Sequence, residues 1–311
     1  MKYSPLFWPI RLQGNKIIVL DETLLPHKLN FITVRDYKDS CRVIKQMKTR
    51  AIGQVLLVFY TFLLILKQNN AKKNTLPLLK KIANALNSTR PTLSFKYITD
   101  MVLSWAQADG KLEKKILSFL EMLKNMRIRQ AKDLSKLIKN NDAILTHCNI
   151  SGLLSLAADF SRKEKKKIRF YVTETRPYLQ GSRLTAWELK NSGFDVTVIA
   201  DNMVAQVMKE GKISKVVVGA DHLARNGDIA NKIGTYQIAL LAKHFKIPFY
   251  AVCPPASNAK AGSDIKIEIR PEDELLVFNG KKIAPEGVNG YYPAFDITPD
   301  KLITRHIYMG I

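Results

Sequence analysis

The pattern of hydrophobic positions divides the chain into two parts. After Asn140 and Asn141, short apolar runs rich in Val and Ile alternate with longer amphipathic segments. Such runs are typical of strands buried in a parallel sheet, and their alternation with helices indicates right-handed βαβ units. Strands are predicted at 143–146, 168–172, 196–200, 215–218 and 249–252, and helices begin near Ser151, Arg183, Asn202 and Asn231. We therefore predict a Rossmann-like parallel-sheet domain over residues 141–311.

The first part of the chain, residues 1–140, has mostly the helical period. One arm of a small hairpin is predicted at 16–20, and a short strand at 30–34. Helices are predicted at 36–49, 52–66, 76–87, 92–108 and 112–138. The segment 52–66 is apolar on nearly all sides but contains Gln54 and is too short to span a bilayer, so we expect a buried helix. The fold class is therefore α/β, with a mainly helical N-terminal domain before the Rossmann-like one.

Composition favours a globular protein with an uneven charge. Hydrophobic residues make up 46% of the 311 residues, and the net charge is +22. Residues 1–150 carry 26 Lys and Arg against 10 Asp and Glu, whereas residues 151–311 carry 23 against 17. Because the lysines are not interleaved with aromatic residues in a binding stripe, a solvated lysine-rich surface explains the charge better than nucleic-acid binding.

Three cysteines without framework spacing favour a reducing cytoplasm. The N-terminus lacks the apolar region of a signal peptide, so neither secretion nor a membrane anchor is expected. No G-x-G-x-x-G follows the first predicted strand of the second domain, so no dinucleotide cofactor is predicted.

The stretch 215–236 contains the first group of candidate site residues. Asp221 comes directly after the apolar strand 215–218, at the carboxyl end where open α/β sheets hold their reactive groups. A turn at 226–228 precedes Asn231 and Lys232, which are expected to lead into a helix and to face the same cleft as Asp221. In the alternative interpretation Asp221 caps a helix, and Asn231 and Lys232 are only its solvated start.

Cys148 is the second candidate. It follows the strand 143–146 and precedes a predicted helix, whose N-terminus would lower the pKa of the thiol. Like Asp221, it ends a strand of the predicted sheet, although a buried, inert cysteine is the commoner fate. Neighbours on a strand point to opposite faces, so His147 is not expected to pair with it. Cys41 and Cys253 have no such setting and are expected in the core.

A third candidate lies at 173–189, after the second predicted strand. Arg176, Gln180 and Arg183 are spaced so that they can bind an anion, helped by the amides at the start of the next helix. Ordinary helix capping with a surface arginine pair explains the same residues equally well.

Several consecutive motifs resemble one family. They are LTHCN at 145–149, ETRPYLQGSRLTAWEL at 174–189, VVVGADHLARNGDIANKIGTY at 216–236, IAPEGV at 283–288 and PAFDITPDKLIT at 293–304. Together they resemble the family that comprises methylthioribose-1-phosphate isomerase, ribose-1,5-bisphosphate isomerase and the α, β and δ subunits of translation initiation factor 2B. The resemblance covers nearly the whole chain and implies a helical domain followed by a Rossmann-like domain, usually paired in a homodimer.

The resemblance implies that Cys148 and Asp221 are the two catalytic residues of an aldose–ketose isomerase. The residues that match substrate contacts are Gln180, Asn231, Lys232 and, for the phosphate, Arg90. In an aldose 1-phosphate the ring must open, and Asp221, kept protonated by burial, would donate a proton to the ring oxygen. The Cys148 thiolate would then move the proton between C2 and C1, and neither step needs a metal or a nucleotide.

The chain departs from the isomerase pattern in three places. Where the isomerases carry R-G-A-P-A-I-G, this chain reads Arg50-Ala51-Ile52-Gly53, which keeps the arginine that helps hold the substrate but loses a flexible glycine. Phe95 and Tyr292 also depart from the pattern. Three functions are therefore considered: isomerisation of methylthioribose 1-phosphate in methionine salvage, the same chemistry on another sugar phosphate such as ribose 1,5-bisphosphate, and non-catalytic regulation like that of initiation factor 2B.

Overall fold

The chain forms two compact units, residues 1–126 and 127–311. The computed structural model describes residues 3–69, 75–90, 95–108 and 111–310. The division falls inside helix α5 (Leu112–Leu137), whereas the change of hydrophobic pattern places it at 140/141. A continuous helix carries no local signal for such a division, because its hydrophobic period does not change where its packing partners do.

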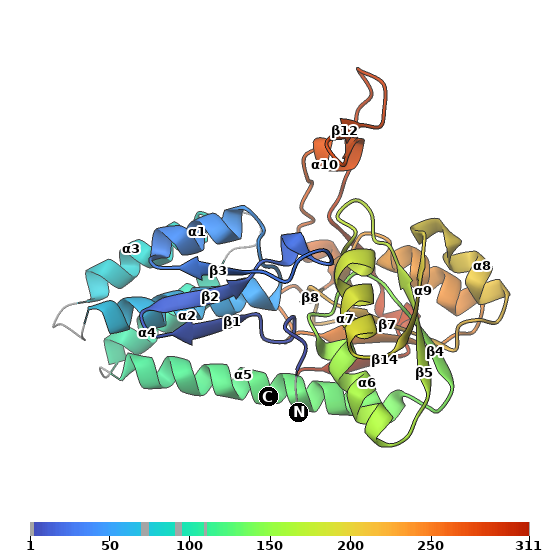
Figure 1. Cartoon of the computed structure of the whole chain (residues 1–311), viewed down its shortest axis with the longest axis horizontal. Coiled ribbons are helices and arrows are strands. Elements are labelled where there is room, and N and C mark those ends of the chain that lie inside the picture. The colour runs from blue at the N-terminus through green and yellow to red at the C-terminus, as the bar shows by residue number, and fades with distance from the viewer. Residues whose placement is uncertain (1–2, 70–74, 91–94, 109–110, 311) are drawn as a thin grey trace. The chain divides into compact units, whose positions relative to one another are not determined.

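The first unit begins with an antiparallel sheet in the order β1-β2-β3 (Figure 1). The strands are β1 (Ile10–Gln13), β2 (Lys16–Leu20) and β3 (Phe31–Val34). β1 and β2 form the predicted hairpin, with Gln13 opposite Lys16 and Gly14 at a φ of +57° in the turn. Glycine suits this turn because it adopts positive φ without a steric cost.

The helices of the first unit follow the predicted pattern. They are α1 (Tyr37–Lys45), α2 (Ile52–Gln68), α3 (Leu76–Asn87), α4 (Lys96–Ala108) and the first part of α5. α1 ends before the predicted Thr49, and Met47 has a φ of +53°, outside the helical region. α2 is buried over most of its length, as predicted. Among the described residues, no helix combines the length and the hydropathy needed to cross a membrane.

The second unit is built on a six-stranded parallel sheet in the order β14-β10-β7-β4-β5-β6. Its strands are β4 (Asp142–Thr146), β5 (Ile168–Thr173), β6 (Asp195–Ile199), β7 (Lys215–Gly219), β10 (Phe249–Cys253) and β14 (Arg305–Tyr308). The first five confirm the prediction from apolar runs. β14 was not predicted, because its sequence RHIY is mostly polar or aromatic and lies at the edge of the sheet.

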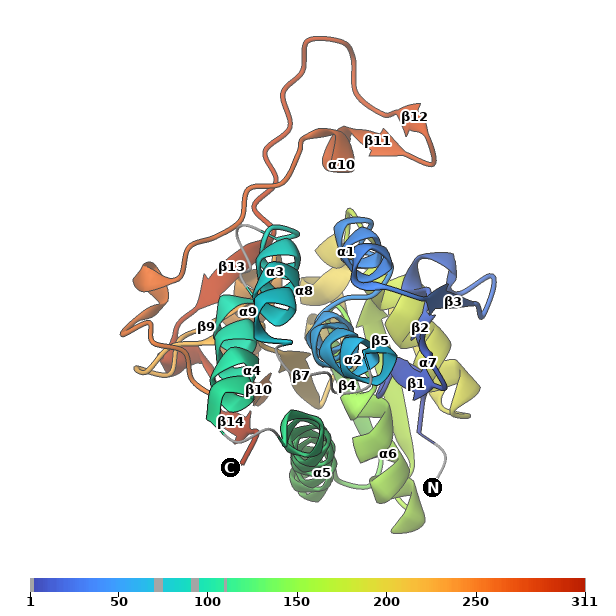
Figure 2. The same ribbon diagram turned by 90° about the vertical axis from the view of Figure 1, so that its left-hand side faces the viewer.

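Helices cover both faces of this sheet (Figures 1 and 2). They are α6 (Leu153–Lys163) and α7 (Ala186–Asn191) on one side and α8 (Val204–Lys209) and α9 (Thr235–His244) on the other. Val204 and Val207 of α8 and Ile238 of α9 pack with Val216 and Val218 in one buried core cluster. A π-helical turn (Gly181–Thr185) precedes α7, and 3₁₀ turns lie at Glu22–Leu24, Asp201–Met203, Gly262–Asp264 and Asp300–Leu302.

Two smaller β structures complete the second unit. β8 (His222–Leu223), β9 (Ile229–Lys232) and β13 (Phe295–Thr298) form an antiparallel sheet in the order β13-β9-β8. An arm made of α10 (Asp273–Leu276), β11 (Val277–Phe278) and β12 (Lys281–Lys282) extends away from the main sheet (Figure 2).

The prediction that Asn231 and Lys232 start a helix was wrong. Both residues belong to β9, and the helix begins at Thr235.

Candidate functional site

Cys148 and Asp221 follow adjacent parallel strands, β4 and β7, as their predicted places at strand ends require. Leu145 of β4 pairs with Val216 of β7. The strand order reverses between these two strands, because β5 and β6 continue on one side of β4 and β10 and β14 on the other side of β7. In open α/β sheets the crevice at such a reversal is the usual ligand site. The candidate site therefore lies at the carboxyl ends of β4 and β7.

The backbone of Cys148 is held by two threonines. Its N–H donates to Thr175 Oγ1 at 2.9 Å, and its carbonyl oxygen accepts from Thr185 Oγ1 at 2.5 Å. Its φ is +62°, a conformation that a non-glycine residue keeps only when its surroundings impose it. α6 begins at Leu153 with Gly152 as its N-cap residue, close to the predicted start near Ser151. Cys148 lies four residues before this cap, and the effect of the helix N-terminus on its thiol stays a prediction.

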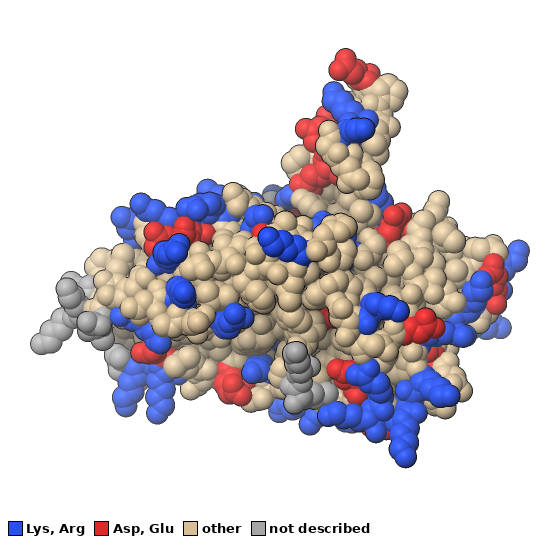
Figure 3. All heavy atoms as spheres, in the orientation of Figure 1, with Lys and Arg blue, Asp and Glu red and all other residues tan. Residues whose placement is uncertain are grey.

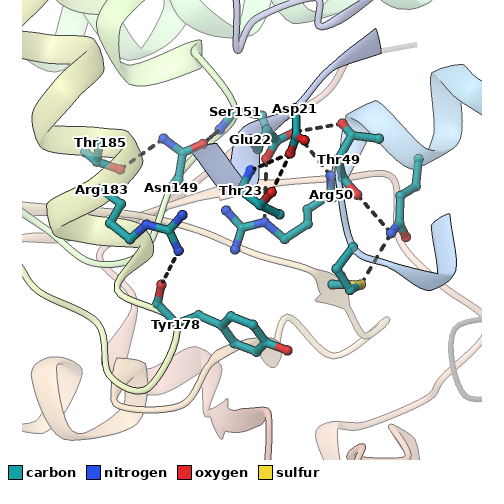
Figure 4. Close-up of polar contacts among 12 residues, drawn as sticks. Asp21, Glu22, Thr23, Thr49, Arg50, Asn149, Ser151, Tyr178, Arg183 and Thr185 are labelled. Atoms are coloured by element: carbon teal, nitrogen blue, oxygen red, sulfur yellow. Dashed lines mark hydrogen bonds and ion pairs between the residues drawn. The ribbon is translucent and has the colours of Figure 1, made fainter. Parts of the chain in front are cut away.

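The residues around Cys148 are tied down in turn. Asn149 donates to Thr185 Oγ1 at 3.0 Å and accepts from the Ser151 amide at 2.9 Å (Figure 4). On the other side, the Asp201 carboxylate accepts from the Thr175 amide and from the following amide, each at 2.7 Å. The conformation of the Cys148 loop is therefore set by hydrogen bonds from the segment after β5 and from the π-helical turn before α7. Asp201, after β6, holds the segment that contains Thr175.

His147 is buried and both of its ring nitrogens are engaged. Nδ1 lies 2.7 Å from Thr173 Oγ1, and Nε2 lies 2.8 Å from the carbonyl oxygen of Ile233. Burial lowers its pKa from the usual value, opposed by the negative charge of Asp201. As expected from the strand alternation, the imidazole is directed into the protein and hydrogen-bonds to these two groups.

Asp221 is fixed by a backbone hydrogen bond and is not buried. Its N–H donates to the Ala230 carbonyl oxygen at 2.9 Å, next to the β8–β9 pairing. The residue itself is exposed in this structure. The expectation that Asp221 is buried is therefore wrong.

Asn231 and Lys232 are buried polar residues of β9. Asn231 Nδ2 donates to Thr235 Oγ1 at 2.9 Å. Its Oδ1 lies next to Gly219 at the end of β7, 3.9 Å from the position that a Cβ on this glycine would occupy. Lys232 Nζ lies 3.5 Å from Tyr292 Oη and 4.9 Å from the centre of the Phe295 ring. The small antiparallel sheet thus brings both residues to the ends of the main sheet, although not as the start of a helix.

Gln180 and the two arginines near it are placed differently from one another. Gln180 is 5% exposed, and its Oε1 has no hydrogen-bond partner in the part of the chain that the structure describes. Arg183 Nη1 donates to the Tyr178 carbonyl oxygen at 3.5 Å (Figure 4). Arg176 donates to the Leu275 carbonyl oxygen at 3.0 Å and lies over an aromatic ring of the arm. Arg176 thus contacts the arm, and the anion site proposed for the segment 173–189 stays a prediction.

Tyr292 is a site residue that sequence reasoning identified only as a departure from the family pattern. It is 3% exposed, and its hydroxyl is within reach of Lys232. Its pKa is raised, first by burial and then by the charges of Glu274, Tyr178 and Cys148. An aromatic hydroxyl thus lies beside Lys232, and no local sequence signal indicates this, because the two residues are 60 positions apart in the chain.

In the first unit, Arg50 is paired with a buried carboxylate. Glu22 Oε1 accepts from Thr49 Oγ1 at 2.7 Å and from the Arg50 amide at 3.1 Å, and the Arg50 Nε lies 3.5 Å from Glu22 Oε2 (Figure 4). Burial raises the pKa of Glu22, and Arg50 opposes this rise. Glu22 was not predicted, because it is separated from Arg50 by a strand and a helix.

Arg90 contacts the same segment of the first unit. Its Nη1 lies 2.9 Å from Met47 Sδ and 3.4 Å from Gln54 Oε1, while the Gln54 amide donates to the Thr49 carbonyl oxygen at 3.0 Å. The first unit therefore brings Arg50 and Arg90 to the shortened segment 47–54. Pro91 and Thr92, which follow Arg90 in the chain, lie outside the described residues.

The described residues contain no group of three or more His, Cys, Asp and Glu side chains arranged to hold a metal ion. The candidate residues at the ends of β4 and β7 offer a thiol, a carboxyl, a lysine and amide groups.

Comparison with known proteins shows which family the chain belongs to. Residues 50–308 match the initiation factor 2 subunit family. A methylthioribose-1-phosphate isomerase of Fervidobacterium nodosum is 38% identical, over 94% of this chain and 91% of its own length. Methylthioribose-1-phosphate isomerase 1 of Pseudothermotoga lettingae is 40% identical over the same shares. The chain belongs to the initiation factor 2 subunit family.

Solved structures with the same fold carry two kinds of name. The 5-methylthioribose 1-phosphate isomerase of Pyrococcus horikoshii superposes with a TM-score of 0.87 and 29% identity, covering 99% of this chain and 94% of that one. The structure named translation initiation factor eIF-2B, subunit delta, of A. fulgidus superposes with a TM-score of 0.83 and 32% identity, covering 97% and 94%. The fold is therefore shared by proteins named as enzymes and proteins named as initiation-factor subunits.

Proposed function

We propose that this protein is an aldose–ketose isomerase of methionine salvage that converts S-methyl-5-thioribose 1-phosphate to the ketose 1-phosphate. The observation that carries the proposal is the similarity to proteins named methylthioribose-1-phosphate isomerase, at 38% and 40% identity over 94% of the chain. The placement of a thiol and a carboxyl at the ends of β4 and β7 supports it, because this is where the fold class binds its ligands.

The reaction rearranges one molecule and adds nothing to it. The bond between C1 and the ring oxygen breaks, the ring oxygen takes a proton, one hydrogen moves from C2 to C1, and the C2 hydroxyl becomes a carbonyl. In the proposed mechanism Asp221 is the general acid that protonates the ring oxygen, and Cys148 moves the hydrogen from C2 to C1. Since Asp221 is exposed, its role rests on its position after β7 and not on burial.

The remaining site residues are proposed to hold the substrate. In the proposed Rossmann-like catalytic domain, residues 141–311, Gln180 offers a buried amide oxygen, and Asn231 and Lys232 contribute an amide and a cation from β9. In the helical domain, residues 1–140, Arg90 is proposed to bind the phosphate and Arg50 to help hold the substrate. Arg50 must do so while paired with Glu22.

The test is turnover of two sugar phosphates. Purified full-length protein is mixed with S-methyl-5-thioribose 1-phosphate or with ribose 1,5-bisphosphate, and ketose formation is followed by NMR. We expect conversion of the first, with kcat reduced by about 10²–10⁴ in Cys148→Ala and in Asp221→Asn, the range of a lost acid–base group. Cys41→Ala is the matched control for the thiol and should retain activity. Full activity in Cys148→Ala would contradict the proposed role, and conversion of ribose 1,5-bisphosphate alone would identify the other substrate.

One observation favours a second candidate, a non-catalytic regulatory protein. The A. fulgidus structure named as an initiation-factor subunit is 32% identical and covers nearly the whole chain. If the folded protein converts neither sugar phosphate and its pull-down at physiological salt recovers initiation factor, this candidate replaces the isomerase.

We also propose that the protein is a cytoplasmic homodimer. Three free cysteines suit a reducing compartment, and the family resemblance implies pairing through the Rossmann-like domain. Light scattering after size exclusion tests the dimer, and a monomeric mass at micromolar concentration would contradict it.

A further inference from the structure

His147 is a buried titratable residue that the proposed chemistry does not use. It is 2% exposed, and both ring nitrogens lie within hydrogen-bond distance of protein oxygens. A backbone carbonyl can only accept, so the nitrogen facing Ile233 O, Nε2, carries the hydrogen. In the neutral ring Nδ1 then accepts from the Thr173 hydroxyl. The lowered pKa of His147 agrees with this neutral form.

The ring joins three segments that meet at the candidate site. His147 immediately precedes Cys148, Thr173 is the last residue of β5, and Ile233 immediately follows Lys232 of β9. The hydrogen bond of 2.8 Å to Ile233 O therefore links the segment that carries the thiol to the strand that carries the proposed substrate lysine. This link crosses from the main sheet to the small antiparallel sheet.

The ring has little freedom to move. Gly234 has a φ of +103°, and a Cβ at this position would lie 3.2 Å from His147 Cε1. The imidazole thus packs directly on the Gly234 backbone. The Gly234 amide is itself held by Asp296 Oδ2 at 2.7 Å, so the surface on which the ring packs is also fixed.

We propose that His147 is a positioning residue that fixes the Cys148 thiol relative to Asn231 and Lys232. It acts through the Cys148 backbone and through Ile233, and it does not contact the substrate. The thiol and the substrate contacts belong to different sheets, and this hydrogen bond joins the residue before Cys148 directly to the residue after Lys232. The inference rests on the proposed isomerase function for its kinetic consequences, but not for its structural ones.

The kinetic test compares two amides at the same position. The amide of His147→Gln reaches the place of Nε2 and can still donate to Ile233 O, whereas the shorter amide of His147→Asn cannot. We expect kcat to fall by about 10²-fold in His147→Asn, the cost of a misplacement of about 1 Å, with KM changed by less than about threefold. His147→Gln should recover at least about tenfold of that loss.

A matched control exists in the same unit. His306 Nε2 lies 2.8 Å from the Gly227 carbonyl oxygen on a different edge of the sheet, so His306→Asn removes the same kind of hydrogen bond away from Cys148. It should leave kcat unchanged. Equal losses in His147→Gln and His147→Asn, or a loss in His306→Asn as large as in His147→Asn, would overturn the proposal.

A second measurement needs no substrate. Alkylation of Cys148 by iodoacetamide, counted by mass spectrometry of its peptide, should change in rate by at least about threefold in His147→Asn but not in His306→Asn, because only the former loosens the thiol. Should His147→Asn fail to fold, Thr173→Val removes the hydroxyl that holds Nδ1 and should change the rate in the same direction. An unchanged alkylation rate would overturn the inference. If the wild type turns over no sugar phosphate but the alkylation rates differ as expected, the proposed function fails and the positioning role stands.

Discussion

At the residue scale, a buried ion pair holds the ends of β4 and β7 that are opposite to the candidate site. Lys215 Nζ lies 2.6 Å from Asp142 Oδ2, and both side chains are less than a tenth exposed. Ser214 donates to the other carboxylate oxygen, and Lys215 also donates to the Leu137 carbonyl oxygen at 2.6 Å. The two strands that precede Cys148 and Asp221 are therefore tied together by this charged group and by the backbone pairing of Ile144 and Leu145 with Lys215 and Val216.

Removing one partner of this pair should be costly. Lys215→Met leaves the Asp142 carboxylate buried with only neutral donors, and we expect the free energy of unfolding to fall by about 3 kcal/mol, the lower end of the range for a broken buried pair. Urea denaturation of the full chain measures the change. Lys212→Met, which removes an exposed lysine from the turn before β7, is the control and should have no measurable effect. Equal stability of the two variants would show that the buried charge is compensated by other groups.

The residue scale also shows the limit of prediction from sequence at the site. Cys148 and Asp221 were correctly placed at strand ends because the apolar runs before them define those ends. The groups that hold Cys148, Thr175 and Thr185, could not be predicted, since they are 27 and 37 residues away and only the fold brings them close. Gln180 gave no local signal that its amide oxygen would be buried.

At the element scale, strands with local signals were predicted and strands made by distant pairing were not. The run at 215–218 has β-branched residues that favour a strand. By contrast, β9 (IANK) has two polar residues and pairs on one side with β13, about sixty positions later. Its strand conformation comes from that pairing, which a local pattern cannot reveal, and this explains why Asn231 and Lys232 were assigned to a helix.

The junction of β13 with α9 gives a prediction about pH. Asp296 of β13 accepts from the Gly234 and Tyr236 amides at 2.7 and 3.1 Å, and burial raises its pKa from 3.8 to about 6. The folded state therefore binds this proton more tightly than the unfolded state, so the contribution of Asp296 to stability is largest at low pH and is lost as the pH rises through about 6. The stability of the small sheet that carries Lys232 should thus be higher in mild acid than at neutral pH.

The measurement compares wild type with Asp296→Asn in urea at several pH values. Between about pH 5 and 7.5 the free energy of unfolding of the wild type should fall relative to that of the variant by about 1–1.5 kcal/mol. Glu286→Gln, which changes a side chain that is 93% exposed on the arm, is the control and should run parallel to the wild type. If the free energy of unfolding of the wild type instead rose with pH relative to that of Asp296→Asn, the raised pKa would be contradicted.

At the scale of the whole molecule, the two kinds of domain were predicted from the change of hydrophobic period, but the extent of each compact unit was not. The period changes after residue 140, whereas the compact units meet inside α5. In the second half of α5, Gln130 donates to the carbonyl oxygens of Cys253 and Ile307, each at 2.8 Å, at the ends of β10 and β14. Tertiary hydrogen bonds of this kind decide which unit a helical turn belongs to, and they leave no trace in its amphipathic pattern.

The net charge of +22 gives the last prediction, because like charges on one molecule repel one another and destabilise its compact state. Lys and Arg side chains are spread over the face shown in Figure 3 and gather near the end of α6. Salt screens this repulsion over a Debye length of about 10 Å at 0.1 M. We expect the midpoint of thermal unfolding to rise by about 2–4 °C between about 0.02 and 0.3 M sodium chloride, which corresponds to about 1 kcal/mol.

The control variant replaces Lys163, Lys167 and Arg169, three exposed residues around that end of α6, with glutamate and so reverses their charge. If repulsion is the cause, this variant unfolds at a higher temperature than the wild type at low salt and gains less from added salt. A midpoint that falls with salt in the wild type would instead mean that attractive surface ion pairs, such as Lys136 with Asp133, dominate its electrostatics.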